Sequence, residues 1–427
     1  MLIYIPFIYF TTWLILHLCV SKARFGAGAM SLLWVDLSAL FAILLDARNL
    51  YGEFGCNPDA ISLSGIVIYC LCWTIALYPL IKLDKISFNE LSVTKPRLFT
   101  IICYVFIFSM VAHIAFIDID SIIAGFTKDM AEAYSESLES ETYQGGAGNF
   151  IMWIPNIISS FGPLYLMLWF ISLTLCRQNR IIRIGLLLSS MLAMISGVAA
   201  GGRAQLIWWF ITFMIYFYLF KPTLSKQHIR SIYILLISAG SLVLIAFLAI
   251  TLSRFDDGGD QAMDSFIGYA GQQINNFCTI IPHAKIGPTY PKHILPLYNY
   301  IINHEAVRLQ DYHAIIGDAF PYQMNVFFTF FGDLTHDIGL GGLCVFMIMY
   351  MLICSRIVDN KQEGSFTFAK LLLMSILIRF PVEGLFSWPF VRYNHSLFML
   401  FTCGMFFIFQ YTLKYGQKRI LWKRNYH

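Results

Sequence analysis

The sequence predicts an all-α polytopic membrane protein, a helical bundle of about eleven transmembrane helices that forms a single integral membrane domain over residues 1–427. Composition is the first observation, since 58% of the residues are hydrophobic and only 13% are charged. A soluble domain has about 45–50% apolar and about 25% charged residues. The second observation is that the apolar residues form long runs, and the third is that Lys and Arg alternate between the connections. These features exclude a secreted disulfide scaffold, a disordered chain and a DNA-binding domain.

The apolar runs are the predicted spans, because a membrane helix needs about 20 mostly apolar residues. The eleven runs are 2–20, 30–46, 61–81, 98–117, 150–176, 184–200, 204–220, 231–253, 338–355, 366–388 and 395–413. Strands of a membrane β-barrel would be shorter and would alternate in polarity. The first run has no basic segment before it and no small-residue cleavage site, so we expect a retained span instead of a cleaved signal.

The connections alternate in charge along the chain. Six of them carry 20 of the 29 Lys and Arg residues and only four acids: 21–29, 82–97, 177–183, 221–230, 356–370 and 414–427. Their net charge is +16, and that of the remaining residues is −12. Because cytoplasmic loops are enriched in Lys and Arg, these six connections are predicted to be cytoplasmic. The N-terminus is then outside and the C-terminus inside.

Two larger loops fall on the external side. Residues 118–149 are acidic and polar, and residues 254–337 form the longest connection, a length that is usually functional. Within it, Phe266–Ile281 and Ile294–Ile302 have apolar residues at helical spacing and are predicted to be short helices at the outer membrane surface. The semi-apolar stretch 314–331 either stays outside or dips into the membrane. Only Cys56 and Cys278 lie in external loops, where they form one disulfide or remain thiols, and no metal-ligand spacing is present.

Arginines on the external side are the first chemical signal, because the charge rule disfavours cations there. Arg presents a planar fork that holds phosphate through two hydrogen bonds, so an anionic headgroup is the predicted ligand. The alternative is that they pair with external acids or reach lipid phosphates. Four lie near the outer ends of different spans and one in the long loop: Arg203, Arg254, Arg379, Arg392 and Arg308.

Two of these arginines have informative neighbours. Gly202 precedes Arg203 in a tight external turn, where glycine lets the backbone approach a ligand closely. Arg379 lies inside a predicted span, with Glu383 one turn later on the same face and Pro381 between them, which predicts a kink. A charge inside a membrane helix indicates function, and the alternative is a buried structural ion pair.

His336 and Asp337 are placed by the sequence at the outer mouth of the ninth span. Either side chain can take a proton from a sugar hydroxyl. The alternative is a solvated helix cap, which suits Asp at a helix N-terminus. Other external histidines show no ligand spacing and are interpreted as surface residues: His283, His293, His304, His313 and His395.

Three short motifs resemble the group of O-antigen polymerases (Wzy) and O-antigen ligases. They are Ser196-Gly197 followed by Gly202-Arg203, the stretch from Phe266 to Phe277, and Asn325 followed by Asp337-x-Gly339. The resemblance covers about residues 190–345. It implies a GT-C-like, inverting, metal-independent glycosyltransferase without a cofactor, at the periplasmic face of the bacterial inner membrane.

The resemblance also implies the substrates and partners. Undecaprenyl-diphosphate-linked oligosaccharides would be donor and acceptor, membrane lipid would surround the protein, and a chain-length regulator would be a partner, with no nucleic acid involved. Ligase relatives carry a His directly before the matching Asn, whereas this chain has Met324, which favours a polymerase.

The predicted function is therefore polymerisation of O-antigen or capsule repeat units. Asp337 is the predicted base, with His336 as second choice. The predicted substrate-binding residues are Arg203, Arg254, Arg308, Arg379, Arg392, Gly202, Asn325 and Glu383. One alternative is a ligase that transfers the glycan to the lipid A core. The other is a lipid-linked oligosaccharide flippase, which needs charges along a path through the bilayer and often has structural repeats.

Overall fold

The structure is a computed structural model that describes residues 1–20, 24–86, 90–93, 95–116, 161–175, 179–199, 204–252, 259–285, 294–303, 327–359, 365–391, 393–411 and 420–423. It divides into two compact units, each assembled from segments that are distant in sequence. Unit 1 comprises Met1–Lys85, Asp260–Asp359 and Leu377–Ser396. Unit 2 comprises Ile86–Gly259, Asn360–Ile376 and Leu397–His427.

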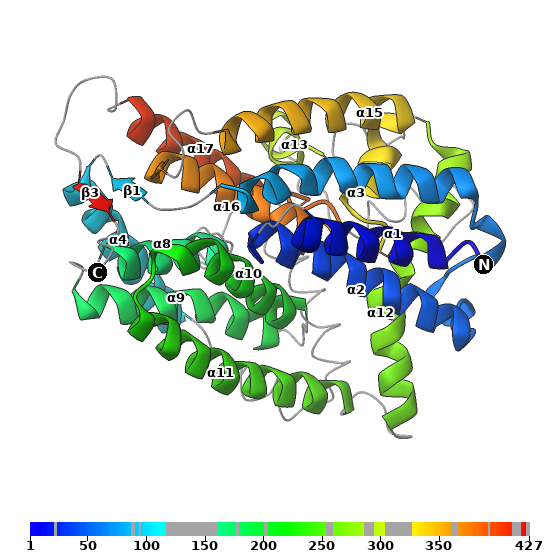
Figure 1. The fold of residues 1–427 in the computed structure, drawn as a ribbon, viewed down its shortest axis with the longest axis horizontal. Coiled ribbons are helices and arrows are strands. Elements are labelled where there is room, and N and C mark those ends of the chain that lie inside the picture. Colours follow the sequence, from blue (N-terminus) through cyan, green and yellow to red (C-terminus); the bar gives the residue numbers. More distant parts are fainter. Residues whose placement is uncertain are drawn as a thin grey trace. The chain divides into compact units, whose positions relative to one another are not determined.

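Most of the described residues are helical, as predicted (Figure 1). The α-helices of the described part are α1 (Tyr4–Ile15), α2 (Ala27–Ala47), α3 (Leu63–Asp84), α4 (Pro96–Phe116), α8 (Gly162–Thr174), α9 (Arg180–Ala199), α10 (Ala204–Phe220), α11 (Lys226–Leu252), α12 (Gly259–Ile280), α13 (Pro296–Asn303), α15 (Phe330–Val358), α16 (Phe368–Val382) and α17 (Tyr393–Tyr411). Each of the eleven predicted spans overlaps one of them.

Membrane crossing is supported by length and composition for some of these helices. Within the described residues, four segments are long and apolar enough to cross a membrane: Ala27–Ala47, Leu63–Asp84, Ala204–Thr223 and Phe330–Val358. Shorter apolar helices occur at Tyr4–Cys19, Pro96–Ala112, Gly162–Thr174 and His395–Gln410. A crossing by all eleven segments stays a prediction.

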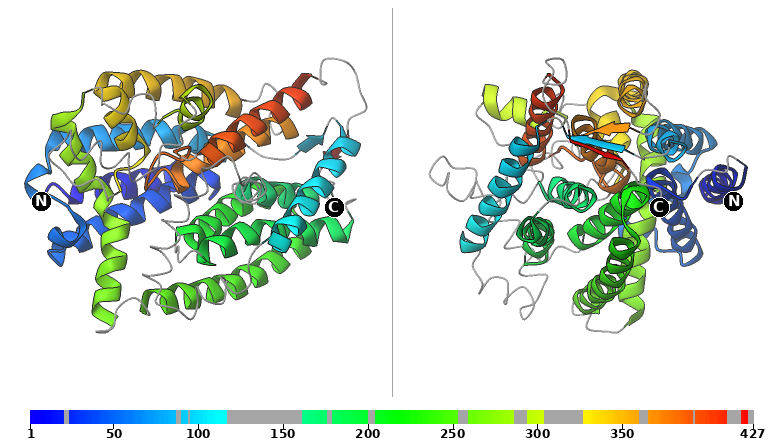
Figure 2. Two further views of the ribbon diagram at one scale, coloured as in Figure 1. Left: turned by 180° about the vertical axis from the view of Figure 1, so that it is seen from behind. Right: turned by 60° about the vertical axis from the view of Figure 1, so that its left-hand side comes forward.

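A small sheet in unit 2 departs from the all-α prediction. Strands β1 (Glu90–Val93), β2 (Ser365–Thr367) and β3 (Ile420–Lys423) lie side by side in the order β2-β1-β3 (Figure 2). β1 pairs with β2 in parallel and with β3 antiparallel, so that Leu91 opposes both Phe366 and Trp422. Strands of three or four residues inside charged connections are too short for alternation to reveal them. Each strand comes from a different basic connection, which places three of these six connections together.

Side-chain contacts join basic connections in unit 1 as well. The carboxylate of Asp84 accepts hydrogen bonds from the backbone N–H groups of Gly28 (2.9 Å) and Ala29 (2.7 Å), which begin α2. Lys82 forms an ion pair with Asp359 at the end of α15. One more basic connection, 21–29, thereby meets the one that contains β1, and 356–370 gains a second contact with it, as expected for segments on the same side of a membrane.

The core of unit 1 forms where α1, α2 and α3 run side by side (Figure 1) and α15 packs on α3. An aromatic cluster fills the contact between α3 and α15. The ring centroids of Trp73 and Phe330 are 5.8 Å apart, and those of Tyr69 and Phe331 are 5.5 Å apart. Since Trp73 lies halfway along α3, the first turn of α15 begins in the middle of the bundle.

α12 is a helix, as predicted for Phe266–Ile281, and it packs in the core of unit 1; its place at the outer membrane surface stays a prediction. Four consecutive or nearly consecutive amides on it are buried: Gln272, Gln273, Asn275 and Asn276. Asn275 exchanges two 2.9 Å hydrogen bonds with the backbone of Asn57, and Asn276 donates to the carbonyl of Phe327 (3.2 Å). These amides are buried because they satisfy backbone groups of irregular segments, which apolar periodicity does not reveal.

Unit 2 is a second helical core, built around α8. α8 is buried along almost its whole length and packs against α9 and α10. Phe170 of α8 stacks on Phe220 of α10 with ring centroids 5.6 Å apart, and the hydroxyls of Thr174 and Thr223 lie 3.0 Å apart. The last contact joins the ends of α8 and α10, next to two further basic connections.

Candidate functional site

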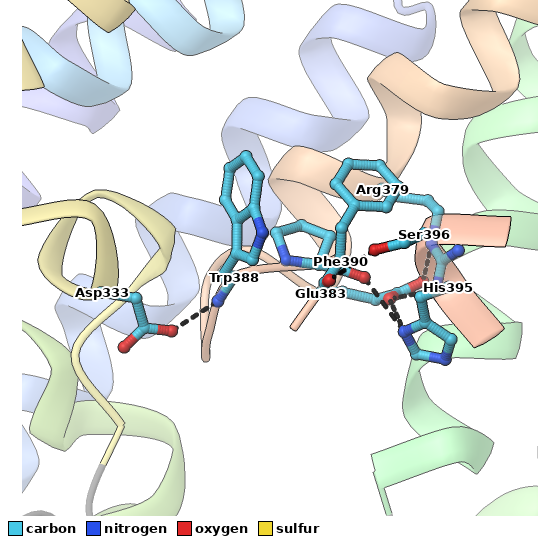
Figure 3. Close-up of polar contacts among 8 residues, drawn as sticks. Asp333, Arg379, Glu383, Trp388, Phe390, His395 and Ser396 are labelled. Carbon is cyan, nitrogen blue, oxygen red and sulfur yellow. Dashed lines mark hydrogen bonds and ion pairs between the residues drawn. The ribbon is translucent and has the colours of Figure 1, made fainter. Parts of the chain in front are cut away.

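Five ionisable residues of unit 1 lie near the start of α15, the end of α16 and the start of α17. Figure 3 shows four of them, with Arg379, Glu383 and His395 close together and Asp333 joined to their loop through the backbone of Trp388. We call them the charged cluster: Asp333, Asp337, Arg379, Glu383 and His395. They come from three elements separated in sequence, and the residues between α16 and α17 connect them. Four of the five are buried, and His395 is partly exposed.

α15 is broken, and the break shapes the cluster. Thr329 caps its start, accepting a hydrogen bond from the N–H of Gly332 (3.3 Å), and Gly339 interrupts it with φ 66° and ψ 176°. Phe380 contacts both Phe330 (5.2 Å) and Tyr350 (4.8 Å). In a straight helix residues 330 and 350 would be about 30 Å apart. The chain therefore turns back at Gly339, and 330–338 is a short helix that starts in the middle of the bundle.

The break in α15 tests two sequence predictions, the span at 338–355 and the position of 314–331. The predicted span at 338–355 is confirmed as a helix, but the preceding residues, predicted to be its outer mouth, form the short buried helix. The described part of 314–331, residues 327–331, lies inside unit 1 at the level of Trp73. Irregular backbone at the depth of a membrane core occurs only where it is buried in protein or lines a water-filled cavity.

Asp333 and Asp337 lie one turn apart on this short helix, and their side chains share a face. Asp333 is 7% exposed and accepts a hydrogen bond from the backbone N–H of Trp388 (2.6 Å). Asp337 is fully buried and accepts one from the N–H of Ile294 (2.9 Å). Asp337 is thus no solvated cap, since the cap of α15 is Thr329. His336 is buried too, with its ring edge-on to Phe328 at 5.1 Å.

Arg379 and Glu383 form the pair that the helical spacing predicted. Nε and Nη2 of Arg379 each donate a 2.7 Å hydrogen bond to a different oxygen of Glu383. The guanidinium lies over the ring of Phe390 at 5.5 Å, and both charged side chains are buried. The fork that would hold a phosphate is therefore closed on Glu383, as in the structural alternative. Pro381, where a kink is predicted, lies one residue before the end of α16 at Val382.

Residues 383–391, which we call the 383–391 loop, connect the cluster. The N–H of Phe330 donates to the carbonyl of Gly384 (2.7 Å), and the N–H of Thr329 donates to the carbonyl of Phe386 (3.3 Å). Together with the bond from Trp388 to Asp333, these contacts fix the end of α16 against the start of α15. The indole of Trp388 packs against aromatic rings of α15, α16 and the loop: Phe346, Phe380 and Phe390.

His395, in the first turn of α17, is a member of the cluster that the sequence interpretation assigned to the surface. Its Nδ1 lies 3.0 Å from the carbonyl oxygen of Pro389 and 3.9 Å from Oε2 of Glu383. The next residue, Ser396, donates from its hydroxyl to the carbonyl of Phe390 (3.0 Å). No spacing in the sequence signals this role, because the contacts depend on how the 383–391 loop folds.

Asp36 is a second buried carboxylate that sequence reasoning missed. It lies within α2 and is 6% exposed, and both its oxygens accept hydrogen bonds from the hydroxyl of Thr11 (3.1 and 3.0 Å). A single acid inside an apolar run predicts no partner from its spacing, and its partner, Thr11, lies on another helix.

Several predicted site residues lie outside the described residues: Arg203, Arg254, Arg308, Arg392, Gly202 and Asn325. The external loop 118–149 lies outside them as well. The structure therefore brings together Arg379 and Glu383, places His336 and Asp337 on the adjoining short helix, and adds Asp333 and His395.

Cys56 and Cys278 are free thiols, so no disulfide joins them. Cys56 donates to Oδ1 of Asn276 (3.3 Å), and burial raises the pKa of Cys56 to about 12 and that of Cys278 to about 11. Both thiols stay protonated and poorly reactive at neutral pH. In the part of the chain that the structure describes, no group of three or more His, Cys, Asp and Glu side chains is arranged to hold a metal ion.

No family model, no curated protein and no solved structure matches the chain. The resemblance to O-antigen polymerases therefore depends on the short motifs alone. The charged cluster, with its buried carboxylates and arginine, is the part of the described structure that indicates a function.

Proposed function

We propose that this protein is a membrane glycosyltransferase that polymerises undecaprenyl-diphosphate-linked oligosaccharide repeat units at the periplasmic face of the bacterial inner membrane. The observation that carries the proposal is the charged cluster, which brings three buried carboxylates, a buried arginine and a partly exposed histidine into a mainly apolar helical unit. Ionisable residues within membrane helices are costly to bury, and where they occur they mark functional sites.

The orientation is part of the proposal. The cluster includes Asp333 and Asp337 of the short helix 330–338, while the far end of α15 carries Asp359 in its ion pair with Lys82 of a basic connection. With the basic connections cytoplasmic, the C-terminus is cytoplasmic, the N-terminus is periplasmic, and the cluster is entered from the periplasmic side. This agrees with the side on which lipid-linked repeat units are polymerised by the proteins that the motifs resemble.

The proposed reaction is an inverting transfer without a metal ion. A hydroxyl of the acceptor unit attacks the anomeric carbon of the donor chain, and undecaprenyl diphosphate leaves. Because the diphosphate is a good leaving group, the protein has mainly to position the two substrates and stabilise negative charge. In this proposal Arg203, Arg254, Arg308 and Arg392 contact the diphosphate. Arg379 holds Glu383 in place through two hydrogen bonds.

The direct test uses the purified full chain in lipid vesicles with undecaprenyl-diphosphate-linked repeat units. We expect products longer than one unit, resolved by size on a gel, without added metal and in the presence of a chelator. A ligase would instead require a lipid A core acceptor and would not lengthen the lipid-linked units. Absence of any lengthening by the intact protein would overturn the proposal.

A flippase is the second candidate, and one observation favours it. The short helix of α15 starts at the level of Trp73, halfway along α3, and transporters keep their substrate sites near the middle of the membrane on interrupted helices. The same vesicles distinguish the two candidates. A flippase would move a fluorescent lipid-linked unit from the outer to the inner leaflet, where a membrane-impermeant quencher cannot reach it, without forming longer chains.

A further inference from the structure

His395 differs from the other members of the charged cluster in the way it is held. A backbone carbonyl oxygen only accepts hydrogen bonds, so the 3.0 Å contact with Pro389 requires the proton of the neutral ring to be on Nδ1. The lone pair of the neutral ring is then on Nε2. This arrangement, with one ring nitrogen fixed by the backbone and the other basic, is the one that a histidine base needs.

The other ionisable groups of the cluster are less suitable as proton acceptors. Both oxygens of Glu383 are held in the fork of Arg379, which is itself always protonated. Asp333 and Asp337 are 7% and 0% exposed and accept backbone N–H groups. The His395 side chain is 19% exposed, the largest value in the cluster. A base has to come within about 2.6–3.2 Å of the hydroxyl that it deprotonates, which favours the accessible group.

We propose that His395 is the proton acceptor in the glycosyl transfer, an inference that rests on the proposed function. The acceptor hydroxyl oxygen forms a bond to the anomeric carbon, and its proton moves to Nε2 of His395. The bond between the anomeric carbon and the diphosphate oxygen breaks, and its electron pair leaves with undecaprenyl diphosphate. The imidazolium later releases its proton to water.

Glu383 has a positioning role in this mechanism. Its Oε2 lies 3.9 Å from Nδ1 of His395, so its negative charge stabilises the imidazolium that forms during transfer. Arg379 holds the carboxylate with two hydrogen bonds and balances its charge when the histidine is neutral. The buried ion pair would then act on the reaction through His395 instead of gripping the diphosphate.

The test compares His395→Asn, His395→Gln and the control Ser396→Ala in the vesicle assay. The amide N–H of Asn can donate to Pro389 as Nδ1 does, but it supplies no basic nitrogen. We expect His395→Asn and His395→Gln to lower kcat by about 10²-fold or more, with KM for the donor within about threefold of the intact protein. Ser396→Ala removes the neighbouring contact between α17 and the loop and should keep at least half of the activity.

A second measurement covers the case in which these variants accumulate poorly. His395→Ala leaves space for free imidazole, which should raise chain extension at least tenfold if a base is missing. Activity of His395→Asn within about threefold of the intact protein, or no response of His395→Ala to imidazole, would overturn the assignment. These outcomes refute only the role of His395, because the intact protein still extends chains. Failure of the intact protein to extend chains would overturn the proposed function itself.

Discussion

At the scale of single residues, burial decides what each carboxylate of unit 1 is able to do. Asp337 is fully buried and accepts the N–H of Ile294, and an Asn carbonyl oxygen can accept the same bond. We therefore expect Asp337→Asn to extend lipid-linked units at a rate within about threefold of the intact protein, measured as initial rates in vesicles. A loss of about 10²-fold would restore Asp337 as the base that the sequence predicts.

The ion pair between Arg379 and Glu383 makes a prediction about stability. Removing one partner of a buried pair leaves an uncompensated charge and costs about 3–5 kcal/mol, whereas replacing both with apolar residues is often neutral. We expect Arg379→Leu to lower the thermal midpoint of the detergent-solubilised protein strongly, and Arg379→Leu with Glu383→Leu to recover most of the loss. Both variants should be inactive. A stable but inactive Arg379→Leu would instead indicate direct contact with the diphosphate.

At the scale of the element, the break in α15 depends on one glycine. Gly339 has φ 66° and ψ 176°, a conformation that is essentially restricted to Gly. We expect Gly339→Ala to destabilise the protein by about 1–3 kcal/mol and to abolish chain extension, because the short helix would lose its direction. The control is Gly341→Ala, since a Cβ there meets nothing within 4 Å. Equal thermal midpoints for the two variants would contradict this account.

The helices also show how much of the fold could be predicted from the sequence. Long apolar runs predicted a helix at each of the eleven spans, because burial in an apolar surrounding is visible in composition alone. The short helix 330–338 was missed because Asp333, Thr335, His336 and Asp337 look like a solvated connection, and their burial depends on partners far along the chain. Residues 383–388 of the 383–391 loop fall in the predicted span 366–388 for the opposite reason, since most of them are apolar although the backbone there is irregular.

The site was predicted only in part, for related physical reasons. Arg379 and Glu383 are four residues apart, at the end of α16 and directly after it, so their spacing along the chain was enough to predict the ion pair. The membership of His395 depends on Pro389 and Glu383 being folded back onto the first turn of α17, which no local pattern encodes. The role of Asp36 could likewise not be predicted, because its hydrogen-bond partner Thr11 lies on another helix.

At the scale of the whole molecule, topology is the property to test. Lys85 and Lys226 are exposed residues of basic connections, and Glu53 is an exposed residue of a predicted external one. We expect single cysteines at Lys85→Cys and Lys226→Cys to resist a membrane-impermeant maleimide in spheroplasts until detergent is added. Glu53→Cys should react at once. Reaction of Lys85→Cys in intact spheroplasts would invert the topology and separate the charged cluster from periplasmic substrates.

The order of the strands in the small sheet has a consequence for biosynthesis. Among the described residues, β1 pairs with the strands that begin at Ser365 and Ile420. At about 5–20 residues per second, the ribosome reaches residue 365 roughly 15 seconds to one minute after residue 90. The helices between β1 and β2 must enter the membrane during that delay, without help from the sheet. The sheet can therefore stabilise the orientation that the helices adopt during insertion into the membrane, but it forms too late to determine that orientation.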